Sequence, residues 1–83
     1  MRIYRIDREE EAIAEVQRYL RAASYRYEQV PHIGIDGIYG KETREAVRAF
    51  QATASLEETR VVDALTFSRL YEESLKKTER NTL

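Results

Sequence analysis

Hydrophobic residues recur at helical spacing in three stretches of the chain, separated by segments in which that spacing breaks down. In each stretch, side chains at positions i, i+3, i+4 and i+7 share one face, as in an amphipathic helix packed on a core. The pattern predicts helices over about residues 8–23, over about residues 41–52, and from Asp63 to about Leu75. Their predicted inward positions are Ile13, Val16, Gln17 and Leu20, then Thr43, Ala46, Val47 and Phe50, then Phe67, Leu70, Tyr71, Ser74 and Leu75.

Polar residues at the predicted boundaries indicate how the helices begin and end. Asp7 and Glu10 have the spacing of a capping box, and Asp63 is an N-cap candidate for the third helix. The sequence after Leu75 is polar, so residues 76–83 are expected to fray as a tail or to serve as a linker.

Residues 24–35 interrupt the helical period and are predicted to form a long loop with some extended backbone. The loop contains Pro31, and its Tyr25 and Tyr27 would share one face if the backbone is extended. Because long surface loops often carry binding residues, we expect the specificity of this protein to lie here.

All three glycines, Gly34, Gly37 and Gly40, lie just before the second predicted helix. Only glycine reaches positive φ without a steric cost, so the unusual backbone geometry of the chain is expected in this turn.

Two apolar-aspartate pairs precede helices: Ile35-Asp36 comes before the second and Val62-Asp63 before the third. Each pair is expected to place its apolar side chain in the core and its carboxylate on free backbone amides. This structural role is favoured over catalysis, because the chain supplies no partner group for an acid–base reaction.

Composition indicates one small domain, residues 1–83, with its core in about residues 7–75. The 14 basic and 15 acidic side chains are spread along the chain, which argues against a nucleic-acid-binding surface. There is no cysteine, and His32 is the single histidine, so neither a metal site nor a cofactor is expected. No segment is apolar enough to span a membrane, and the N-terminal sequence lacks the features of a secretory signal.

A longer pattern joins these elements. Its parts, in order, are Val16-Gln17-x-x-Leu20, Ile35-Asp36-Gly37-x-Tyr39-Gly40-x-x-Thr43-x-x-Ala46-Val47-x-x-Phe50-Gln51, Leu56, and Val62-Asp63-x-x-Thr66-Phe67-x-x-Leu70. The pattern resembles the peptidoglycan-binding domain family of bacterial cell-wall proteins over about residues 12–72. The resemblance implies a compact all-α bundle of three helices with long connecting loops. It also implies a module that anchors amidases, peptidases, transpeptidases or phage lysins on murein.

The sequence departs from the family pattern at two places, and each departure is expected to change the local structure. Arg60 stands where members usually have glycine, so this turn is expected either to adopt another conformation or to accept strain. The loop at residues 24–35 is longer than is common in the family.

Six residues are candidates for contact with glycan or stem peptide in a shallow groove beside the glycine turn. Aromatic faces suit sugars, and the planar guanidinium of arginine suits the carboxylates of a peptide. Each candidate has a structural alternative: core packing for the tyrosines, surface ion pairs for the arginines, and a helix-end hydrogen bond for the glutamine. The candidates are Tyr25, Tyr27, Tyr39, Arg44, Arg48 and Gln51.

Catalysis is not expected, because the chain offers no metal site, no activated nucleophile and no carboxylate pair in a cleft. We expect a binding module that attaches to peptidoglycan and targets a fused or partner wall hydrolase, with no nucleic-acid or membrane partner. The resemblance implies a location in the cell wall or outside the cytoplasm, whereas the missing signal favours a cytoplasmic or phage-released protein, or one domain of a longer chain. The alternative function is a protein–protein interaction module that keeps the fold without wall binding.

Overall fold

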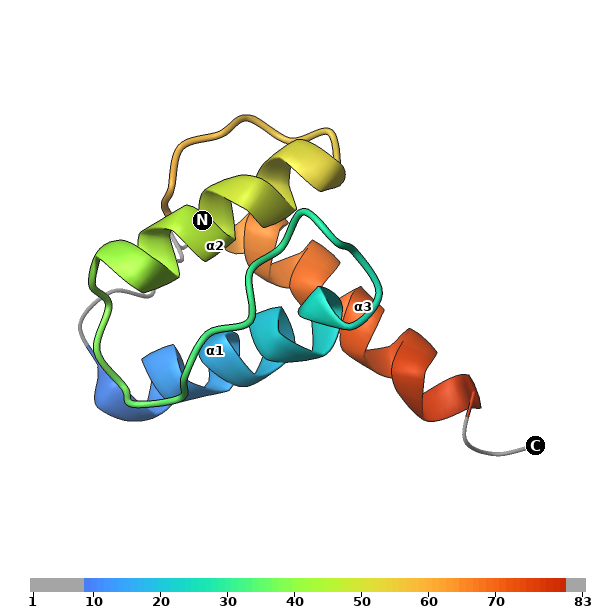
Figure 1. Ribbon diagram of the computed structural model, residues 1–83, viewed down its shortest axis with the longest axis horizontal. Helices are drawn as coiled ribbons and strands as arrows, with labels where there is room; N and C mark the ends of the chain where they lie inside the picture. The colour runs from blue at the N-terminus through green and yellow to red at the C-terminus, as the bar shows by residue number, and fades with distance from the viewer. Residues whose placement is uncertain (1–8, 81–83) are drawn as a thin grey trace.

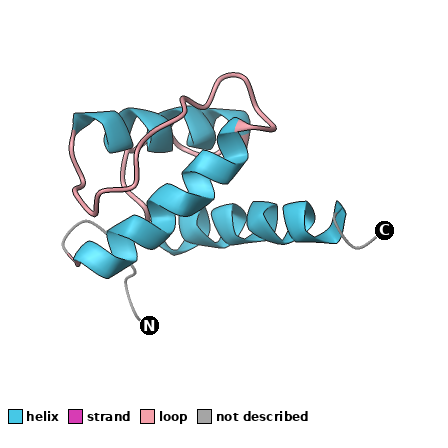
Figure 2. Ribbon diagram, turned by 60° about the horizontal axis from the view of Figure 1, so that its bottom comes forward, coloured by secondary structure: helices cyan, strands magenta, loops and turns pink. Residues whose placement is uncertain are grey.

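The protein is a bundle of three helices joined by two long connections. The computed structural model describes the backbone of residues 9–80 and the side chains of residues 9–75, and no strand is present in that part of the chain. The helices are α1 (Glu10–Ser24), α2 (Lys41–Thr53) and α3 (Ala64–Arg80), and α1 lies against both of the others (Figure 1 and Figure 2). The all-α, three-helix prediction is therefore confirmed.

The core is built from all three helices and from the connections between them. The predicted inward residues of α1 and α2 are buried, as is Leu70 of α3, so the spacing identified these faces correctly. The connections contribute four further apolar side chains to the core, which are Val30, Ile33, Tyr39 and Val62.

The C-terminal half of α3 departs from the prediction. The helix continues past Leu75 to Arg80, so the expected fraying there was wrong. Residues 76–80 include lysine, glutamate and arginine, which are good helix formers and extend the helix without needing a core. Figure 1 shows this end of α3 projecting beyond α1 and α2. Consequently Tyr71 and Leu75, predicted to face inward, are 47% and 50% exposed.

The two predicted N-caps have different outcomes. The carboxylate of Asp63 accepts a hydrogen bond from the backbone N–H of Thr66 at 2.9 Å, which confirms it as the cap of α3. Asp7 of the predicted capping box lies outside the described residues. The N-cap of α1 is Glu9, which makes no side-chain capping bond.

The first connection, residues 25–40, returns from the C-terminal end of α1 to its N-terminal end (Figure 1). The buried side chain of Gln17 on α1 holds it in place. Its Nε2, which has two hydrogens to donate, lies within hydrogen-bond distance of three acceptors: Asp36 Oδ1 at 3.0 Å, the Ile38 carbonyl at 3.1 Å and Thr43 Oγ1 at 2.9 Å. Its Oε1 accepts from the backbone N–H groups of Asp36 at 3.0 Å and Gly37 at 2.9 Å. One amide therefore satisfies the polar groups of the turn and ties it to the start of α2.

The second connection, residues 54–63, is held by Gln51 on α2 in the same way. Its Nε2 likewise lies within hydrogen-bond distance of Thr59 Oγ1 at 3.1 Å, the Val61 carbonyl at 3.0 Å and Thr66 Oγ1 at 3.0 Å. Its Oε1 accepts from the backbone N–H of Arg60 at 3.0 Å. Both glutamines are 1% exposed, so these bonds are shielded from water.

Aligning the two glutamine networks gives a residue-by-residue correspondence between the connections. Asp36 and Asp63 do not correspond in this alignment: Asp36 lies within the turn, where its Oδ1 accepts from the Ile38 N–H at 3.0 Å, as a carboxylate predicted to bind free backbone amides should. Ile35, however, is 39% exposed rather than in the core. The matched pairs are Asp36 with Thr59, Gly37 with Arg60, Ile38 with Val61, Tyr39 with Val62, Gly40 with Asp63, and Thr43 with Thr66.

Positive φ occurs in both connections, not only in the glycine turn. Gly37 has φ 76°, whereas Gly34 and Gly40 are not in this region. Ser55 and Arg60 have φ 62° and 66°. Arg60 therefore accepts the strained conformation, the second of the two alternatives predicted for it. Its carbonyl accepts a hydrogen bond from the hydroxyl of Tyr39 at 2.7 Å, and its N–H is held by Gln51.

Candidate functional site

Tyr27, Tyr39 and Gln51, three of the six predicted site residues, have their polar groups engaged in hydrogen bonds within the fold, and a fourth, Arg48, is engaged in ion pairs. The amide of Gln51 forms hydrogen bonds with the second connection, and the hydroxyl of Tyr39 donates a hydrogen bond to the Arg60 carbonyl. The hydroxyl of Tyr27 donates to Glu73 Oε2 on α3 at 3.0 Å, and its ring packs against the core. These contacts fit the structural alternatives for the three residues.

Tyr25 and Tyr27 do not lie on one extended face. The backbone N–H groups of Arg26 and Tyr27 both bond to the Ala23 carbonyl at 2.9 Å, so the chain turns directly after α1. The turn directs Tyr27 toward α3 and leaves Tyr25 68% exposed. Of this pair, only Tyr25 offers a large surface to a ligand.

Arg44 lies on the exposed side of α2, above the ring of Tyr39. Its guanidinium carbon is 5.0 Å from the ring centroid, within the range of a cation–π contact. No carboxylate in the described part of the chain forms an ion pair with Arg44. Its charge is oriented but not neutralised, which leaves its N–H donors available for an anion.

Arg48, one helical turn further along α2, belongs to a row of alternating surface charges. It contacts Glu45 at 3.0 Å and Glu58 at 3.3 Å, and Glu45 also contacts Arg60 at 3.4 Å. The hydrogen bond from Arg48 lowers the pKa of the Glu45 carboxyl, with Arg60 adding to the effect. Because the four charges balance, this end of α2 is polar without favouring an anion.

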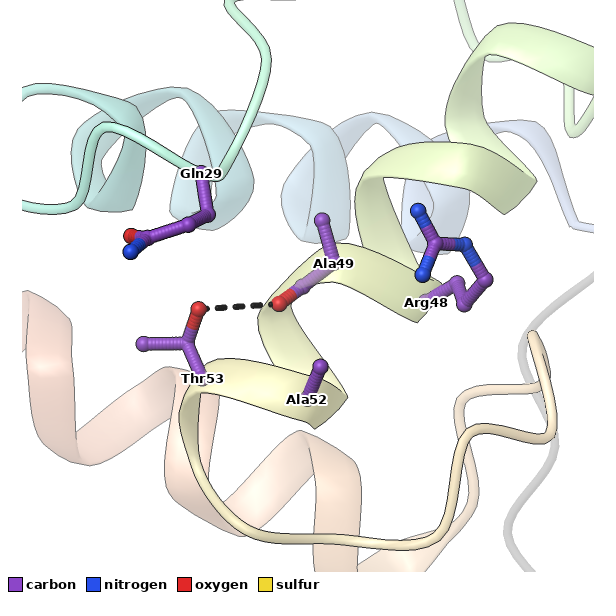
Figure 3. A pocket seen from close by; sticks show the side chains of 5 residues that line it. All are labelled: Gln29, Arg48, Ala49, Ala52 and Thr53. Carbon is purple, nitrogen blue, oxygen red and sulfur yellow. Dashed lines mark hydrogen bonds between the residues drawn. The ribbon is translucent and has the colours of Figure 1, made fainter.

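A hollow of about 440 Å³ lies beside Arg48, between the C-terminal half of α2 and the first connection. Figure 3 shows the methyl groups of Ala49 and Ala52 on its α2 side, with Gln29 reaching across from the first connection toward Thr53. Thr53 donates its hydroxyl to the Ala49 carbonyl at 3.0 Å, so its oxygen remains able to accept a hydrogen bond. The hollow is open to solvent and offers an apolar floor with hydrogen-bonding groups around it.

The hollow lies at the opposite end of α2 from the glycine turn, beside which the sequence predicted a groove. Of the residues that line the hollow, only Arg48 was among the predicted site residues. The others are Gln29, Ala49, Ala52 and Thr53. A run of small residues at i, i+3 and i+4 on α2 is the signal that marks the floor. Nothing in the sequence indicates that Gln29 faces it, because that depends on the path of the long connection.

The described side chains contain no group of histidine, cysteine, aspartate or glutamate residues placed to hold a metal ion. The helices, as far as the structure describes them, are too short or too polar to cross a bilayer. Asp36 and Asp63 are both occupied by backbone N–H groups, as their structural interpretation predicted.

A comparison with protein-family models gives one match. The model described as "Putative peptidoglycan binding domain" matches residues 9–70. The match spans all of α1 and α2, both connections and the first part of α3. No curated protein and no solved structure matches the chain significantly.

Proposed function

Because the chain belongs to the peptidoglycan-binding domain family, we propose that it binds peptidoglycan, without turnover, along the outer face of α2. The proposed surface runs from Arg44 to the hollow at Thr53. The observation that carries this proposal is the hollow, which lies next to a row of exposed polar groups on a single rigid helix. A surface on a helix holds its ligand groups at fixed spacing, which favours recognition of a regular polymer.

The dimensions of this surface suit the stem peptide of peptidoglycan. From Arg44 to Ala52 the helix rises about 12 Å, at about 1.5 Å per residue. An extended peptide covers that length with about four residues, at about 3.3 Å each. The small side chains of Ala49 and Ala52 allow such a peptide to lie close to the helix.

The charges assign an orientation to the bound peptide. Arg44 has no carboxylate partner among the described side chains, so a peptide carboxylate can pair with it without displacing another acid. At the other end, the amide of Gln29 and the hydroxyl of Thr53 suit neutral backbone groups of the peptide. The carboxylate is therefore expected near Arg44, with the amide-rich part of the peptide in the hollow.

A location on the cell wall, and a fused or partner wall-active enzyme that the module targets, follow from the family as proposals. The alternative function, a protein–protein interaction module, is favoured by one observation. Tyr71 and Leu75 leave an apolar strip on α3 about half exposed, on a different helix from the proposed wall-binding surface. The two functions are therefore separable by substitution.

Sedimentation with purified, insoluble murein sacculi tests the proposal. The unaltered protein is expected in the pellet, and Arg44→Ala is expected to weaken binding about tenfold, as for loss of one charge-assisted hydrogen bond. Ala52→Arg is expected to abolish binding, because Ala52 is exposed and a long side chain there occupies the hollow without entering the core.

The matched controls lie on α3, away from the proposed surface. Arg69→Ala removes an exposed arginine, and Ser68→Arg adds one at an exposed small residue. Both controls are expected to bind like the unaltered protein. Retention of the unaltered protein in the supernatant would refute wall binding, and equal loss with Arg44→Ala and Arg69→Ala would refute the α2 surface.

A further inference from the structure

A second cluster of side chains lies where α1 ends and the first connection begins. Arg21 donates its Nε–H to His32 Nε2 at 3.0 Å, and His32 Nδ1 lies 3.1 Å from Ser24 Oγ. The Ser24 hydroxyl donates to the Arg21 carbonyl at 2.6 Å. The three side chains are thereby linked in a closed ring of hydrogen bonds across two elements of the fold.

These bonds indicate which tautomer of His32 fits the cluster. Its Nε2 must be an acceptor, because the Arg21 Nε–H can only donate. Ser24 has a single hydroxyl hydrogen, which it donates to the Arg21 carbonyl. The hydrogen bond between Ser24 Oγ and His32 Nδ1 therefore requires a proton on Nδ1. The geometry therefore fits the Nδ1–H tautomer, with Nε2 accepting from Arg21.

Arg21 is thus positioned by an imidazole nitrogen rather than by a carboxylate. The ion pairs of the described side chains use Arg26, Arg48, Arg60 and Arg69, but neither Arg21 nor Arg18. Arg18 lies one helical turn before Arg21 on α1 and is exposed. This corner of the surface therefore carries two uncompensated positive charges, and one of them is held in a fixed orientation.

An aromatic ring borders the same corner. The ring of Tyr25 lies 5.1 Å from the His32 ring at 65°, an edge-on contact, and the residue is 68% exposed. The edge-on contact fixes the ring while leaving much of its surface open to solvent. Aromatic faces pack against the C–H groups of sugar and polyol rings, and guanidinium groups bind carboxylates and phosphates.

From this arrangement we infer that Arg18, Arg21, His32 and Tyr25 form a second binding site, for an anionic group carried on a sugar or polyol chain. The anion, a carboxylate or a phosphate, pairs with the free guanidinium N–H groups of Arg21 and with Arg18. The adjoining sugar or polyol unit lies against Tyr25. The site shares no residue with the hollow on α2 and does not depend on it.

Binding measurements with three soluble polymers test this inference on the full chain. The probes are a poly(glycerol phosphate), a polygalacturonate and an uncharged dextran. We expect at least one of the two anionic polymers to bind at least tenfold more tightly than dextran. A preference for the first would identify a phosphate ligand, and a preference for the second a carboxylate ligand. Binding of neither anionic polymer above the level of dextran would overturn the inference.

Substitutions separate a built site from general charge attraction. Arg21→Gln is expected to weaken binding of the preferred polymer about tenfold, and Tyr25→Ala several-fold. Arg69→Ala removes the same charge from α3 and is expected to change the affinity less than twofold. If Arg69→Ala weakens binding as much as Arg21→Gln, the attraction is non-specific and the inference fails.

Two further readouts keep the test independent of the α2 surface. The nitrogen chemical shifts of His32 are expected to show the Nδ1–H tautomer, and the other tautomer would remove the basis for the oriented Arg21. Sacculi stripped of anionic polymers are expected to bind Arg21→Gln normally and Ala52→Arg not at all. Loss of sacculus binding in Arg21→Gln would instead show that the two surfaces act as one binding site, and the inference of a separate site would fail.

Discussion

The two connections of this bundle achieve the same fold with different residues. Each begins where a helix ends, runs back along that helix, and is held by a buried glutamine whose amide bonds to the turn and to a threonine in the next helix. Each turn also contains a residue with φ between 66° and 76°, which is glycine in the first connection and arginine in the second.

The difference between Gly37 and Arg60 shows that positive φ alone does not require glycine. A Cβ atom at Gly37 would lie 2.5 Å from the Glu10 Cγ and 3.3 Å from the Glu10 carbonyl oxygen, because this turn packs on α1. The side chain of Arg60 is half exposed and reaches Glu45 at 3.4 Å. The first connection therefore needs glycine for close packing as well as for its backbone angle, and the second tolerates strain of about 1–2 kcal/mol.

The largest expected effect comes from removing the glutamines. Gln17→Ala should lower the free energy of unfolding by about 3–5 kcal/mol, and Gln51→Ala by about 3 kcal/mol, because each leaves buried polar groups unpaired. Gln17 makes the larger contribution because it holds two backbone N–H groups of its turn, whereas Gln51 holds one. Urea unfolding measures both, with Gln29→Ala at an exposed position as the control. A loss below about 1 kcal/mol in either variant would contradict the shared clamping role.

Exchanging the positive-φ residues should change stability in opposite directions. Gly37→Ala should lower the free energy of unfolding by about 2 kcal/mol, because of its backbone angle and its contact with Glu10. Arg60→Gly should raise it by up to about 1 kcal/mol, since relief of strain outweighs the loss of an exposed ion pair. Thermal unfolding of the two variants checks the signs. Destabilisation by Arg60→Gly would show that its side chain contributes more than its strained backbone costs.

The helix caps give a smaller contrast. Asp63→Ala should destabilise the protein by about 1 kcal/mol through loss of the bond to the Thr66 N–H. Gly40, the matching N-cap of α2, makes no side-chain bond, and a Cβ there has only Ile38 Cγ2 nearby, at 4.0 Å. Gly40→Asp is therefore expected to stabilise the protein by a few tenths of a kcal/mol, roughly the gain from glycine to aspartate at an N-cap. Unfolding midpoints in urea measure both changes, and a destabilised Gly40→Asp would show that this cap position differs from Asp63.

The smallest effect is a pH dependence that Asp36 gives to the first connection and that its match in the second connection, Thr59, cannot give. The Ile38 N–H and the Gln17 amide hold the pKa of Asp36 below its ordinary value of 3.8, whereas the matching Thr59 does not titrate. Because the folded-state pKa is the lower one, this stabilisation is complete above the unfolded pKa. It is lost as the pH falls through the folded pKa.

Unfolding of the protein and of Asp36→Asn, followed from neutral to acid pH, checks this contribution. The unaltered protein should lose more stability than the variant as the pH falls below about 4. Glu45→Gln gives the size of a second contribution to be separated from that of Asp36, because the pKa of Glu45 is also lowered, chiefly by Arg48. Parallel profiles for the unaltered protein and Asp36→Asn would remove Asp36 from the pH response.

Helical spacing predicted the three helices and most of the core, because burial on one face leaves a periodic record in the sequence. The spacing was less successful at Tyr71 and Leu75, which are about half exposed, although the Tyr71 ring still contacts Tyr19 of α1 edge-on, at 6.3 Å between ring centroids. The spacing of apolar residues therefore identifies which face of a helix packs inward, but not how far along that face the neighbouring helices extend.

The candidate site was less predictable because it depends on how the long first connection folds. Arg44 and Arg48 lie on the surface now proposed for binding, whereas Tyr39 and Gln51 are buried. The sequence showed that Gln17 and Gln51 lie next to core positions, yet their bonds to turns far along the chain follow only from tertiary structure. Gln29 joins the hollow for the same reason.

The most direct test of wall binding along α2 is a nuclear magnetic resonance titration of the labelled protein with soluble muropeptides. We expect the backbone signals that shift on addition to belong to the α2 segment from Arg44 to Thr53 and to the first connection around Gln29. No change at saturating muropeptide, or changes gathered around Gly37 with α2 unaffected, would contradict this expectation.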